Sequence, residues 1–492
     1  MDVEKDYYAI LGLPQSATDE EVERAYRALA RRYHPNTRTK DVPEDLLRDV
    51  QIAYAVLSDS DRRGAYDKHR AESGISGKPA LAWTILQSQN KLCSLHKEQV
   101  LYLLIEIRPA PTTRGQRLPL NLCLVIDRST SMQGTRLEHV KEAAHQIIDG
   151  LHDDDALAVV TFSDWADVLL PGQQDVNRAY AKAKVSTMSA SGGTEILRGI
   201  QAGLAEVEKH HSDRVTSHII LLTDGQTYGD EEDCIAEARL AGARRIGITA
   251  MGIGEDWNDT LLDEVAAQSG GTSVYIASPG QVRTLLQQKV RGLGEVFAQG
   301  LSLELRCAEA VQVESVFRTS PNVESLTLTD GLVTLGTLRA DAPLTVALEA
   351  SVAQKEPGEH RLLQLELTGD IPSLGRQGEK MRHSVDCTFA PTETPPEPVP
   401  PAILSALSKA TIFRMQERAW DALDDGDVKA ATHQLEMIAT RLFDLGETQL
   451  ARAAMLEAGR LAQSGTPTAK GRKELKYGTR SLTIAPRRES YD

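Results

Sequence analysis

Three short segments carry acidic and hydroxyl residues whose oxygens could bind a metal ion. Residues 127–131 read Asp-Arg-Ser-Thr-Ser, Thr194 follows a Ser-Gly-Gly run, and Asp224 lies in a Leu-Leu-Thr-Asp-Gly run. Two carboxylates and three hydroxyls suit a hard cation such as Mg²⁺, and they suit zinc or copper poorly. Alternatively, Asp127 and Ser131 could only cap the helix expected to follow them.

The elements around these segments predict that the segments meet. Between residues 119 and 291, short apolar runs alternate with amphipathic stretches, which is typical of βαβ units and a mostly parallel sheet. Strands are expected at 122–126, 156–162, 218–222, 247–252 and 273–276, and helices at 137–151, 196–209 and 259–268. Asp127 and Asp224 each directly follow an expected strand, so they should lie at the carboxyl edge of the sheet, where open α/β sheets bind ligands.

Together, the three segments resemble the metal-ion-dependent adhesion site of von Willebrand factor A domains. The resemblance covers residues 118–291. Every position of the motif is present: Asp127, Ser129, Ser131, Thr194 and Asp224. The resemblance implies a site for Mg²⁺, or for Mn²⁺ or Ca²⁺, that binds a protein partner and is not catalytic. In the family the serine hydroxyls coordinate the ion, the carboxylates act partly through water, and one position is left for an acidic residue of the partner.

Residues beside this site would set the choice of partner. The rim candidates are Asp164, Trp165, Asp256 and Trp257. An exposed Trp is a good interface anchor. Ordinary partial burial would account for the two tryptophans as well.

The first 70 residues predict a second, helical module. Helical spacing covers 19–33 and 46–57, with Thr18 as an N-cap. The run from Tyr26 to Asn36 (YRALARRYHPN), with Asp6-Tyr-Tyr-Ala-Ile-Leu-Gly-Leu before it, resembles a J-domain over residues 5–68. The resemblance implies docking on an ATP-driven heat-shock chaperone, through a loop and a basic helical surface. These residues are His34, Pro35, Asn36, Arg24, Arg27, Arg31 and Arg32.

The loop of this module departs from the family pattern. The family has His-Pro-Asp, whereas this chain has Asn36 in the place of the acid. Asn keeps the size and the hydrogen bonding of Asp but loses its charge. Because the family needs that aspartate to stimulate the chaperone ATPase, the change favours a docking or structural role over a competent co-chaperone.

The rest of the chain predicts a multidomain protein. Its expected fold class combines an all-α J-like module, a doubly wound α/β A domain, a flanking β-sandwich and a carboxyl-terminal helical domain. The J-like domain takes residues 1–70, the discontinuous sandwich 80–112 and 299–389, the A domain 118–291, a Pro-rich linker 390–402, the helical domain 403–463 and a flexible basic tail 464–492. Breaks at 424–427 and 445–446 predict three helices in the helical domain. That domain, with 476–480 (KYGTR), resembles the carboxyl-terminal segment of some prokaryotic A-domain proteins.

The composition of the chain disfavours some classes of function. The 492 residues include 55 Lys and Arg against 70 Asp and Glu, a formal charge of -15, and only 4% are aromatic. Both values disfavour a nucleic-acid binder. A charged start and the lack of an 18-residue apolar run predict a cytoplasmic protein that does not enter a membrane. Five scattered cysteines with no CxxC pair fit reduced thiols better than a disulfide framework or a zinc site.

Two functions remain open from the sequence. The first is a non-enzymatic scaffold that binds a protein through a divalent cation, with the J-like module for chaperone or partner docking. The second is a co-chaperone that stimulates a heat-shock ATPase while the A domain recruits clients. An enzyme is disfavoured because the chain has no Walker A loop, GxSxG elbow or HExxH motif.

Overall fold

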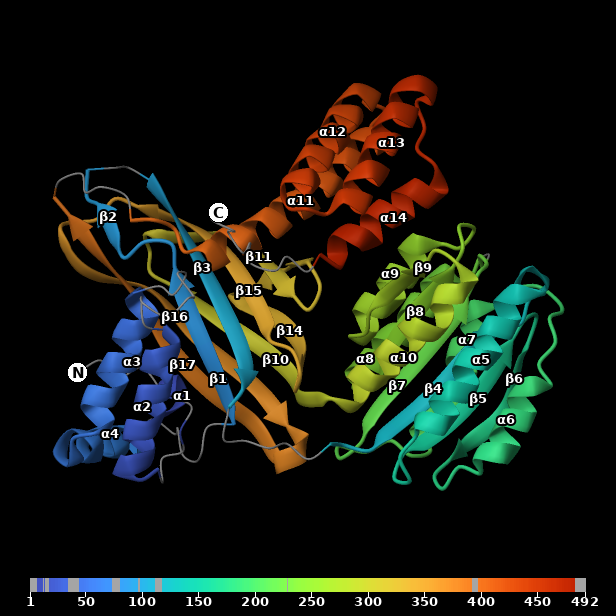
Figure 1. Cartoon of the computed structure of the whole chain (residues 1–492), viewed down its shortest axis with the longest axis horizontal. Helices are drawn as coiled ribbons and strands as arrows, with labels where there is room; N and C mark the ends of the chain where they lie inside the picture. The colour runs from blue at the N-terminus through green and yellow to red at the C-terminus, as the bar shows by residue number, and fades with distance from the viewer. Residues whose placement is uncertain are drawn as a thin grey trace, which may run out of the picture. The chain divides into compact units, whose positions relative to one another are not determined.

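The chain folds as two units, each built from separate stretches of sequence. The computed structural model describes residues 7–11, 13, 17–33, 44–72, 80–95, 98–110, 117–227, 229–391 and 397–482. Unit 1 comprises Met1–Gln116, Phe297–Glu417 and Thr479–Asp492, and unit 2 comprises Arg117–Val296 and Arg418–Gly478. Figure 1 labels their helices and strands. In this described part of the chain, no helix has the length and apolar character needed to cross a membrane.

Unit 2 is centred on a six-stranded sheet in the order β6-β5-β4-β7-β8-β9. The strands are β4 (Leu120–Asp127), β5 (Ala156–Phe162), β6 (Ala166–Gln173), β7 (Thr216–Thr223), β8 (Gly247–Ile253) and β9 (Ser273–Ile276). All neighbours pair in parallel except β6, which is antiparallel to β5. The predicted parallel α/β sheet is therefore confirmed. The sequence did not predict β6, because this edge strand buries only Leu170 fully and lacks a long apolar run.

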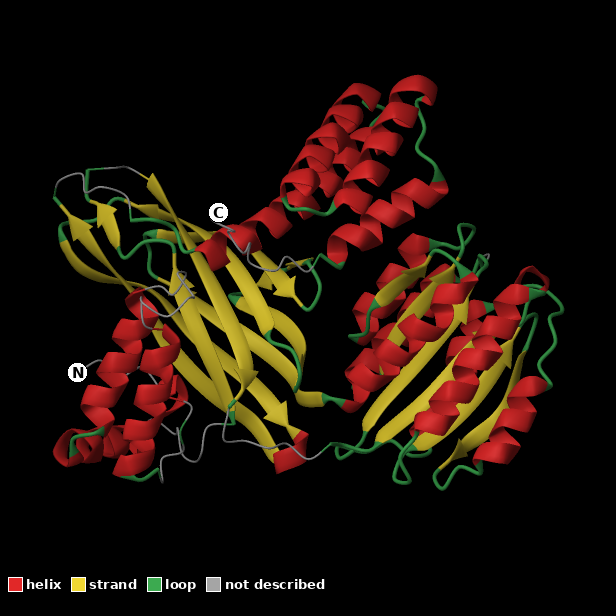
Figure 2. Ribbon diagram, viewed as in Figure 1, coloured by secondary structure: helices red, strands yellow, loops and turns green. Residues whose placement is uncertain are grey.

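Helices cover both faces of this sheet (Figure 2). One face carries α5 (Thr135–Gly150), α6 (Arg178–Ser186) and α10 (Val282–Gly294), and the other carries α7 (Ile196–Glu208), α8 (Glu231–Ala243) and α9 (Asp259–Ser269). Side chains of a strand alternate between the two resulting cores. In β4, Leu124 belongs to the first core and Val125 to the second. Burial on both faces explains why the strands are continuous apolar runs.

Unit 1 contains two mostly antiparallel sheets that share one hydrophobic core, with β2 pairing in parallel with β17. The five-stranded sheet has the order β1-β3-β15-β11-β12, and the six-stranded sheet has the order β13-β14-β10-β16-β17-β2. Their strands are β1 (Leu81–Gln87), β2 (Lys91–Cys93), β3 (Glu98–Pro109), β10 (Val296–Cys307), β11 (Val311–Ser320), β12 (Glu324–Leu326), β13 (Leu328–Thr329), β14 (Leu332–Arg339), β15 (Leu344–Ala353), β16 (Gly358–Ile371) and β17 (Arg376–Ala390). Strands on both sides of the α/β segment in sequence thus form one two-layer body, and the α/β segment is an insertion between β3 and β10.

The described residues of the amino-terminal module form four helices: α1 (Tyr7–Leu11), α2 (Asp19–Tyr33), α3 (Glu44–Leu57) and α4 (Ser60–Glu72). Thr18 and Glu21 form a reciprocal cap at the start of α2, with Thr18 N donating to Glu21 Oε2 (2.8 Å) and Glu21 N to Thr18 Oγ1 (3.3 Å). Tyr7, Tyr8 and Tyr66 are buried in the small core. The expected helices and the Thr18 cap are present.

In the described residues, the carboxyl-terminal domain has the three helices predicted for 403–463 and a fourth in the predicted tail. They are α11 (Pro401–Asp424), α12 (Val428–Asp444), α13 (Thr448–Ser464) and α14 (Ala469–Arg480). The two predicted breaks are present, but the prediction of a flexible tail over 464–492 is wrong for 469–480. Helix α14 lacks an apolar stripe because Lys473 and Thr479 are among its buried side chains, together with Leu475 and Tyr477. Residues 483–492 lie outside the described part.

Candidate functional site

Asp127 is the last residue of β4 and is fully buried at the carboxyl edge of the parallel sheet. Ser129 N donates a hydrogen bond to Asp127 Oδ1 (2.7 Å), and Thr223 Oγ1 donates one to Oδ2 (2.6 Å). Burial raises the pKa of Asp127 to about 6, against the opposing effect of the hydrogen bonds from Thr223 and Ser129. Both carboxylate oxygens are therefore held in fixed directions.

A chain of hydroxyls links this segment to the second acidic residue. Ser129 Oγ lies 2.9 Å from Ser131 Oγ, and Ser131 Oγ donates to Asp224 Oδ1 (2.6 Å). Asp224 directly follows β7, which pairs in parallel with β4, and its side chain has no exposed surface. The predicted convergence of Asp127 and Asp224 at one sheet edge is thus seen in the structure.

Thr194 reaches the same edge through a third loop. A Cβ added to Gly225 would lie 2.9 Å from Thr194 Oγ1, so Thr194 sits against the residue that follows Asp224. The loop is tied to the first segment, because Ser191 N donates to Arg128 O (2.7 Å) and Thr130 N donates to the Gly192 carbonyl (3.1 Å). All five residues of the predicted oxygen set therefore lie together, with Thr194 outside the hydrogen-bonded chain of the other four.

Sequence reasoning missed two residues of this site. The Thr-Asp-Gly run gives Thr223 no role of its own, although its hydroxyl donates to Asp127. Arg136 lies outside the predicted motif, yet its guanidinium forms an ion pair with Asp224 through Oδ2 and donates to Ser131 O (3.2 Å). The only clue to Arg136 is its place in the first turn of α5, five residues after Ser131.

Three of the four predicted rim residues are exposed, and the fourth is buried. Asp164 is exposed, and its Oδ1 accepts a hydrogen bond from Gly193 N (2.8 Å). Trp165 is 56% exposed, and Asp256 is also exposed. Trp257 is only 2% exposed, because Tyr275 and residues of α14 cover its indole. It is therefore a core residue and not a contact for a partner.

The predicted chaperone-docking surface is only partly described. His34, Pro35 and Asn36 lie outside the described residues, as do the side chains of Arg31 and Arg32. Arg24 and Arg27 are exposed on α2, and Arg27 pairs with Glu23 one turn earlier. The docking role of these residues stays a prediction.

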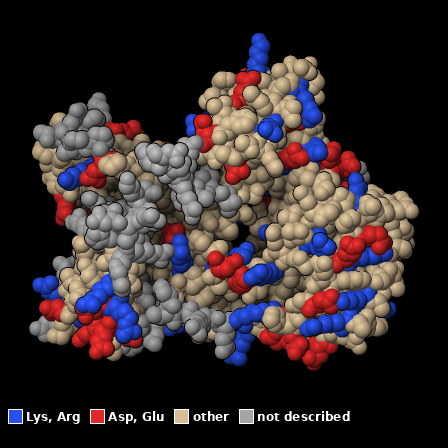
Figure 3. Space-filling model, in the orientation of Figure 1, with Lys and Arg blue, Asp and Glu red and all other residues tan. Residues whose placement is uncertain are grey.

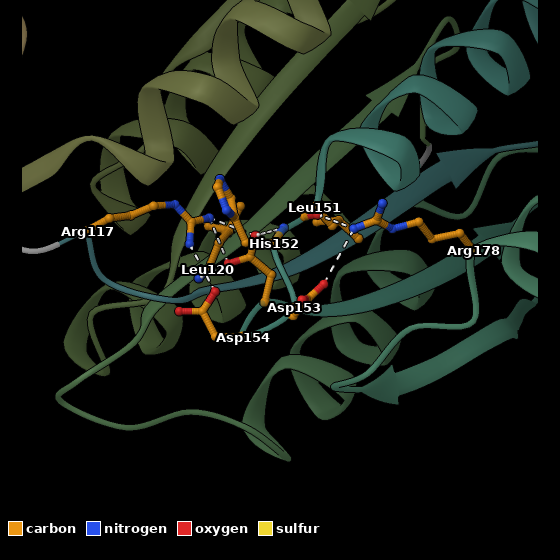
Figure 4. Close-up of polar contacts among 8 residues, drawn as sticks. Arg117, Leu120, Leu151, His152, Asp153, Asp154 and Arg178 are labelled. Carbon is orange, nitrogen blue, oxygen red and sulfur yellow. Dashed lines mark hydrogen bonds and ion pairs between the residues drawn. The ribbon is translucent and has the colours of Figure 1, made fainter.

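The opposite edge of the parallel sheet has a carboxylate that is fully engaged in holding the fold. Asp155 accepts hydrogen bonds from Leu120 N (2.7 Å) and His152 N (2.9 Å), and Arg117 Nη2 lies 2.7 Å from both of its oxygens. Figure 4 shows Arg117 approaching this turn from one side and Arg178 from the other. Arg178 donates to the carbonyl of the nearby Leu151 (2.7 Å). Asp155 therefore has a structural role, because it holds Arg117, Leu120 and His152 together.

The donor set at the carboxyl edge fits a hard divalent cation. Asp127, Ser129, Ser131 and Asp224 are linked by contacts of 2.6–2.9 Å and offer only oxygen atoms. Among the described residues, no three His, Cys, Asp or Glu side chains come together in a way that could hold a metal ion. A cation at this edge would therefore depend on the serine hydroxyls as well as the two carboxylates.

Comparisons with known families match three parts of the chain. A DnaJ domain matches residues 6–67, a von Willebrand factor type A domain matches 121–288, and the Sll0103-like, C-terminal alpha-helical domain matches 401–485. These matches confirm the predicted J-type and A domains. They also extend the carboxyl-terminal domain over α14.

Two curated proteins show how far these similarities reach. The chain is 34% identical over 282 residues to the uncharacterized protein sll0103 of Synechocystis, across 56% of this chain and 67% of that protein. It is 49% identical over 69 residues to the chaperone protein DnaJ 2 of Thermus thermophilus, across 14% of this chain and 25% of the chaperone. The chain thus spans about a quarter of the length of that chaperone, and the likeness is confined to the amino-terminal module.

A solved structure supports the fold over most of the chain. The von Willebrand factor type A protein from Catenulispora acidiphila matches with a TM-score of 0.66 and 18% sequence identity, covering 83% of this chain and 98% of that one. At this level of identity the likeness shows the fold alone.

Proposed function

Because this chain belongs to the family of the Synechocystis protein sll0103 and combines a DnaJ domain with a von Willebrand factor type A domain, we propose that it is a non-enzymatic adaptor. In this proposal the A domain binds a protein partner through a divalent cation, and the J-type module docks a chaperone or a second partner. The observation that carries it is the hydroxyl chain from Ser129 through Ser131 to Asp224, beside the buried Asp127.

The residues at the carboxyl edge would have different roles in binding the ion. Ser129 and Ser131 would hold the ion through their hydroxyl oxygens, Thr194 would join on partner binding, and Asp127 and Asp224 would supply negative charge. Mg²⁺ is the favoured ion, and Mn²⁺ or Ca²⁺ would fit the same oxygen donors. When bound, the ion supplies an electrophilic position for a carboxylate from a partner protein. Trp165, Asp164 and Asp256 would set which partner fits.

The test compares two single substitutions in the full chain. Asp127→Asn keeps a side-chain oxygen for Ser129 N and a polar group for Thr223 but removes the charge. Asp154→Asn is the matched control, since Asp154 is exposed at the opposite edge and only approaches Arg117 at 3.4 Å. We expect partner capture from cell lysate in Mg²⁺ to be lost in chelator and in Asp127→Asn, and kept in Asp154→Asn. Capture that ignores both chelator and Asp127→Asn would refute the proposed metal dependence.

A second function rests on the DnaJ match and on the likeness to the Thermus chaperone. Here the amino-terminal module stimulates the ATPase of a heat-shock chaperone, and the A domain delivers clients. The test measures ATP hydrolysis by the purified chaperone with the full chain and with Asn36→Asp, which restores the family's acid. Stimulation by the unaltered chain would favour this function. No stimulation by either form would remove it.

A further inference from the structure

Arg136 holds the one carboxylate oxygen of Asp224 that the hydroxyl chain leaves open. Asp224 Oδ1 accepts from Ser131 Oγ (2.6 Å), while Oδ2 is paired with the Arg136 guanidinium. The same guanidinium donates to Ser131 O (3.2 Å). Arg136 thus touches the first segment and the second acidic segment of the site at once.

The two partners of this ion pair differ sharply in exposure. The Asp224 side chain has 0% exposure, whereas the Arg136 side chain is 30% exposed. A buried, ionised carboxylate without a counter-charge is unfavourable, so the Arg136 guanidinium stabilises the ionised form of Asp224. Asp224 directly follows a central strand. If its side chain turned toward solvent, its contacts with Ser131 and Arg136 would be lost. Arg136 has a long side chain in the first turn of α5, and it can leave.

The guanidinium borders both the loop that follows β8 and the solvent. A Cβ added to Gly254 would lie 3.3 Å from Arg136 Nη2, so this loop lies against the guanidinium. The Arg136 side chain is 30% exposed, and this exposure gives it a route to water.

We propose that Arg136 is a built-in counter-cation that neutralises Asp224 while no metal is bound and is displaced when a divalent cation binds. This inference rests on the proposed function and adds a cause for the metal affinity of the site. With Arg136 in place, the charges of Asp127, Asp224 and Arg136 add up to one negative charge. Without Arg136 they add up to two. Arg136 therefore lowers the affinity of the site for a divalent cation, so that the ion must compete with a residue of the same chain.

The direct test measures Mn²⁺ binding to the full chain by the electron paramagnetic resonance signal of the free ion. Arg136→Gln should lower the Kd for Mn²⁺ on the order of 10-fold or more, because a positive charge beside the ion is removed. Arg136→Lys keeps the charge and should stay close to the unaltered chain. Arg178→Gln is the matched control, because Arg178 lies at the opposite sheet edge, and it should leave the Kd unchanged.

A metal-free measurement checks the other half of the proposal. In chelator, Arg136→Gln should unfold at a lower temperature than the unaltered chain, because Asp224 is left buried without a counter-charge. Saturating Mn²⁺ should raise the Tm of Arg136→Gln more than that of the unaltered chain, because the ion then replaces the missing guanidinium.

The outcomes separate this inference from the proposed function. If Arg136→Gln binds Mn²⁺ no more tightly than the unaltered chain while Asp127→Asn loses binding, the counter-cation role is overturned and the metal site stands. If the unaltered chain and Asp127→Asn bind Mn²⁺ alike, both proposals fall. A lower Kd in Arg136→Gln together with unchanged binding in Arg136→Lys supports the counter-cation.

Discussion

Buried polar residues of the α/β domain have two kinds of partner. Some are satisfied wholly within the fold, such as His218, whose Nε2 lies 2.9 Å from Thr249 Oγ1. Others line the carboxyl edge, where Ser131 and Asp224 share a hydrogen bond that a cation could replace. The two kinds call for different tests, because the first kind bears on stability and the second kind on the proposed cation binding.

His218 should make the protein sensitive to mild acid. Burial lowers its pKa to about 3, with nearby Lys289 adding to the effect. The unfolded chain takes up a proton near the ordinary value of about 6.5, whereas the folded chain does not. The stability of the neutral state is therefore complete above about pH 6.5 and is lost as the pH falls toward 3, with a loss of about 2 kcal/mol already at pH 5.

The measurement is urea denaturation at pH 7.5 and pH 5, followed by tryptophan fluorescence. His218→Gln should lose less stability than the unaltered chain between these two pH values, by about 2 kcal/mol. His152→Gln removes an exposed imidazole from the same domain and is the control. An equal pH dependence in His218→Gln and the unaltered chain would show that His218 is not held neutral by burial.

Gly252 should be intolerant of a single added methyl group. A Cβ at this position in β8 would lie 2.0 Å from Cε2 of the buried Trp257, so the indole would have to move. We expect Gly252→Ala to lower the free energy of unfolding by about 1–3 kcal/mol, as overpacked core sites do. Gly150→Ala in α5 is the control, because no atom lies within 4 Å of its added Cβ. Equal urea midpoints for the two variants would contradict the close contact.

At the scale of elements, the sequence predicts best the parts whose burial repeats along the chain. The apolar runs of β4, β5 and β7 predict a sheet covered on both faces, and the polar residues at the carboxyl ends of β4 and β7 predict the site. The sequence does not predict the role of Arg136. A basic residue near the start of a helix can form an ion pair or face solvent, and no sequence pattern separates the two cases. Its role depends on Asp224, which is 88 residues away.

Helix α14 shows why the tail could not be predicted. Beside the ring contacts of Tyr477 with Trp257 and Tyr275, its contacts with the α/β domain are polar. Lys473 Nζ donates to the carbonyls of Glu255 (2.5 Å) and Trp257 (2.7 Å), and Tyr477 Oη donates to Asp263 Oδ1 (2.7 Å). Lys476 pairs with Asp259 and Asp263. A basic stretch without apolar periodicity is ordinarily a solvated tail, and only a partner with matching carboxylates and carbonyls makes it a docked helix.

Lys473 should hold α14 against the loop that follows β8. Its amine lies 4.3 Å from the centre of the Trp257 ring in addition to its two carbonyl contacts, and burial lowers its pKa. Lys473→Ala removes these contacts, so hydrogen–deuterium exchange should become faster at 469–480 and at 255–258. Lys470→Ala on the same helix is the control, since Lys470 is 53% exposed and only approaches Glu474 at 3.8 Å. Unchanged protection in Lys473→Ala would mean that Lys473 does not anchor α14.

At the scale of the whole molecule, the excess of acidic residues does not form a patch on the face shown in Figure 3. Lys and Arg side chains intermingle there with Asp and Glu, although the chain carries a net charge of -15. A field of one sign over a wide surface would attract partners by charge alone. The described residues on the face in that view carry no such wide field of one sign.

The discontinuous make-up of unit 2 predicts that the α/β domain needs the carboxyl-terminal helices. Unit 2 joins Arg117–Val296 with Arg418–Gly478, and Tyr477 and Lys473 cover Trp257. Excised residues 117–296 should therefore expose that indole to water. Trp165→Phe in this fragment and Trp420→Phe in a separate fragment 397–482 leave Trp257 as the only tryptophan of the pair. The fluorescence emission then comes from Trp257 alone.

Adding fragment 397–482 to fragment 117–296 should shift the Trp257 emission to shorter wavelength, because the indole is buried again. It should also raise the Tm of 117–296 by about 5 °C, as expected if docking stabilises the domain by roughly 2 kcal/mol. The same fragment with Lys473→Ala and Tyr477→Ala should do neither, since it lacks the groups that cover Trp257. If the emission and the Tm respond equally to both versions, α14 does not dock through Lys473 and Tyr477.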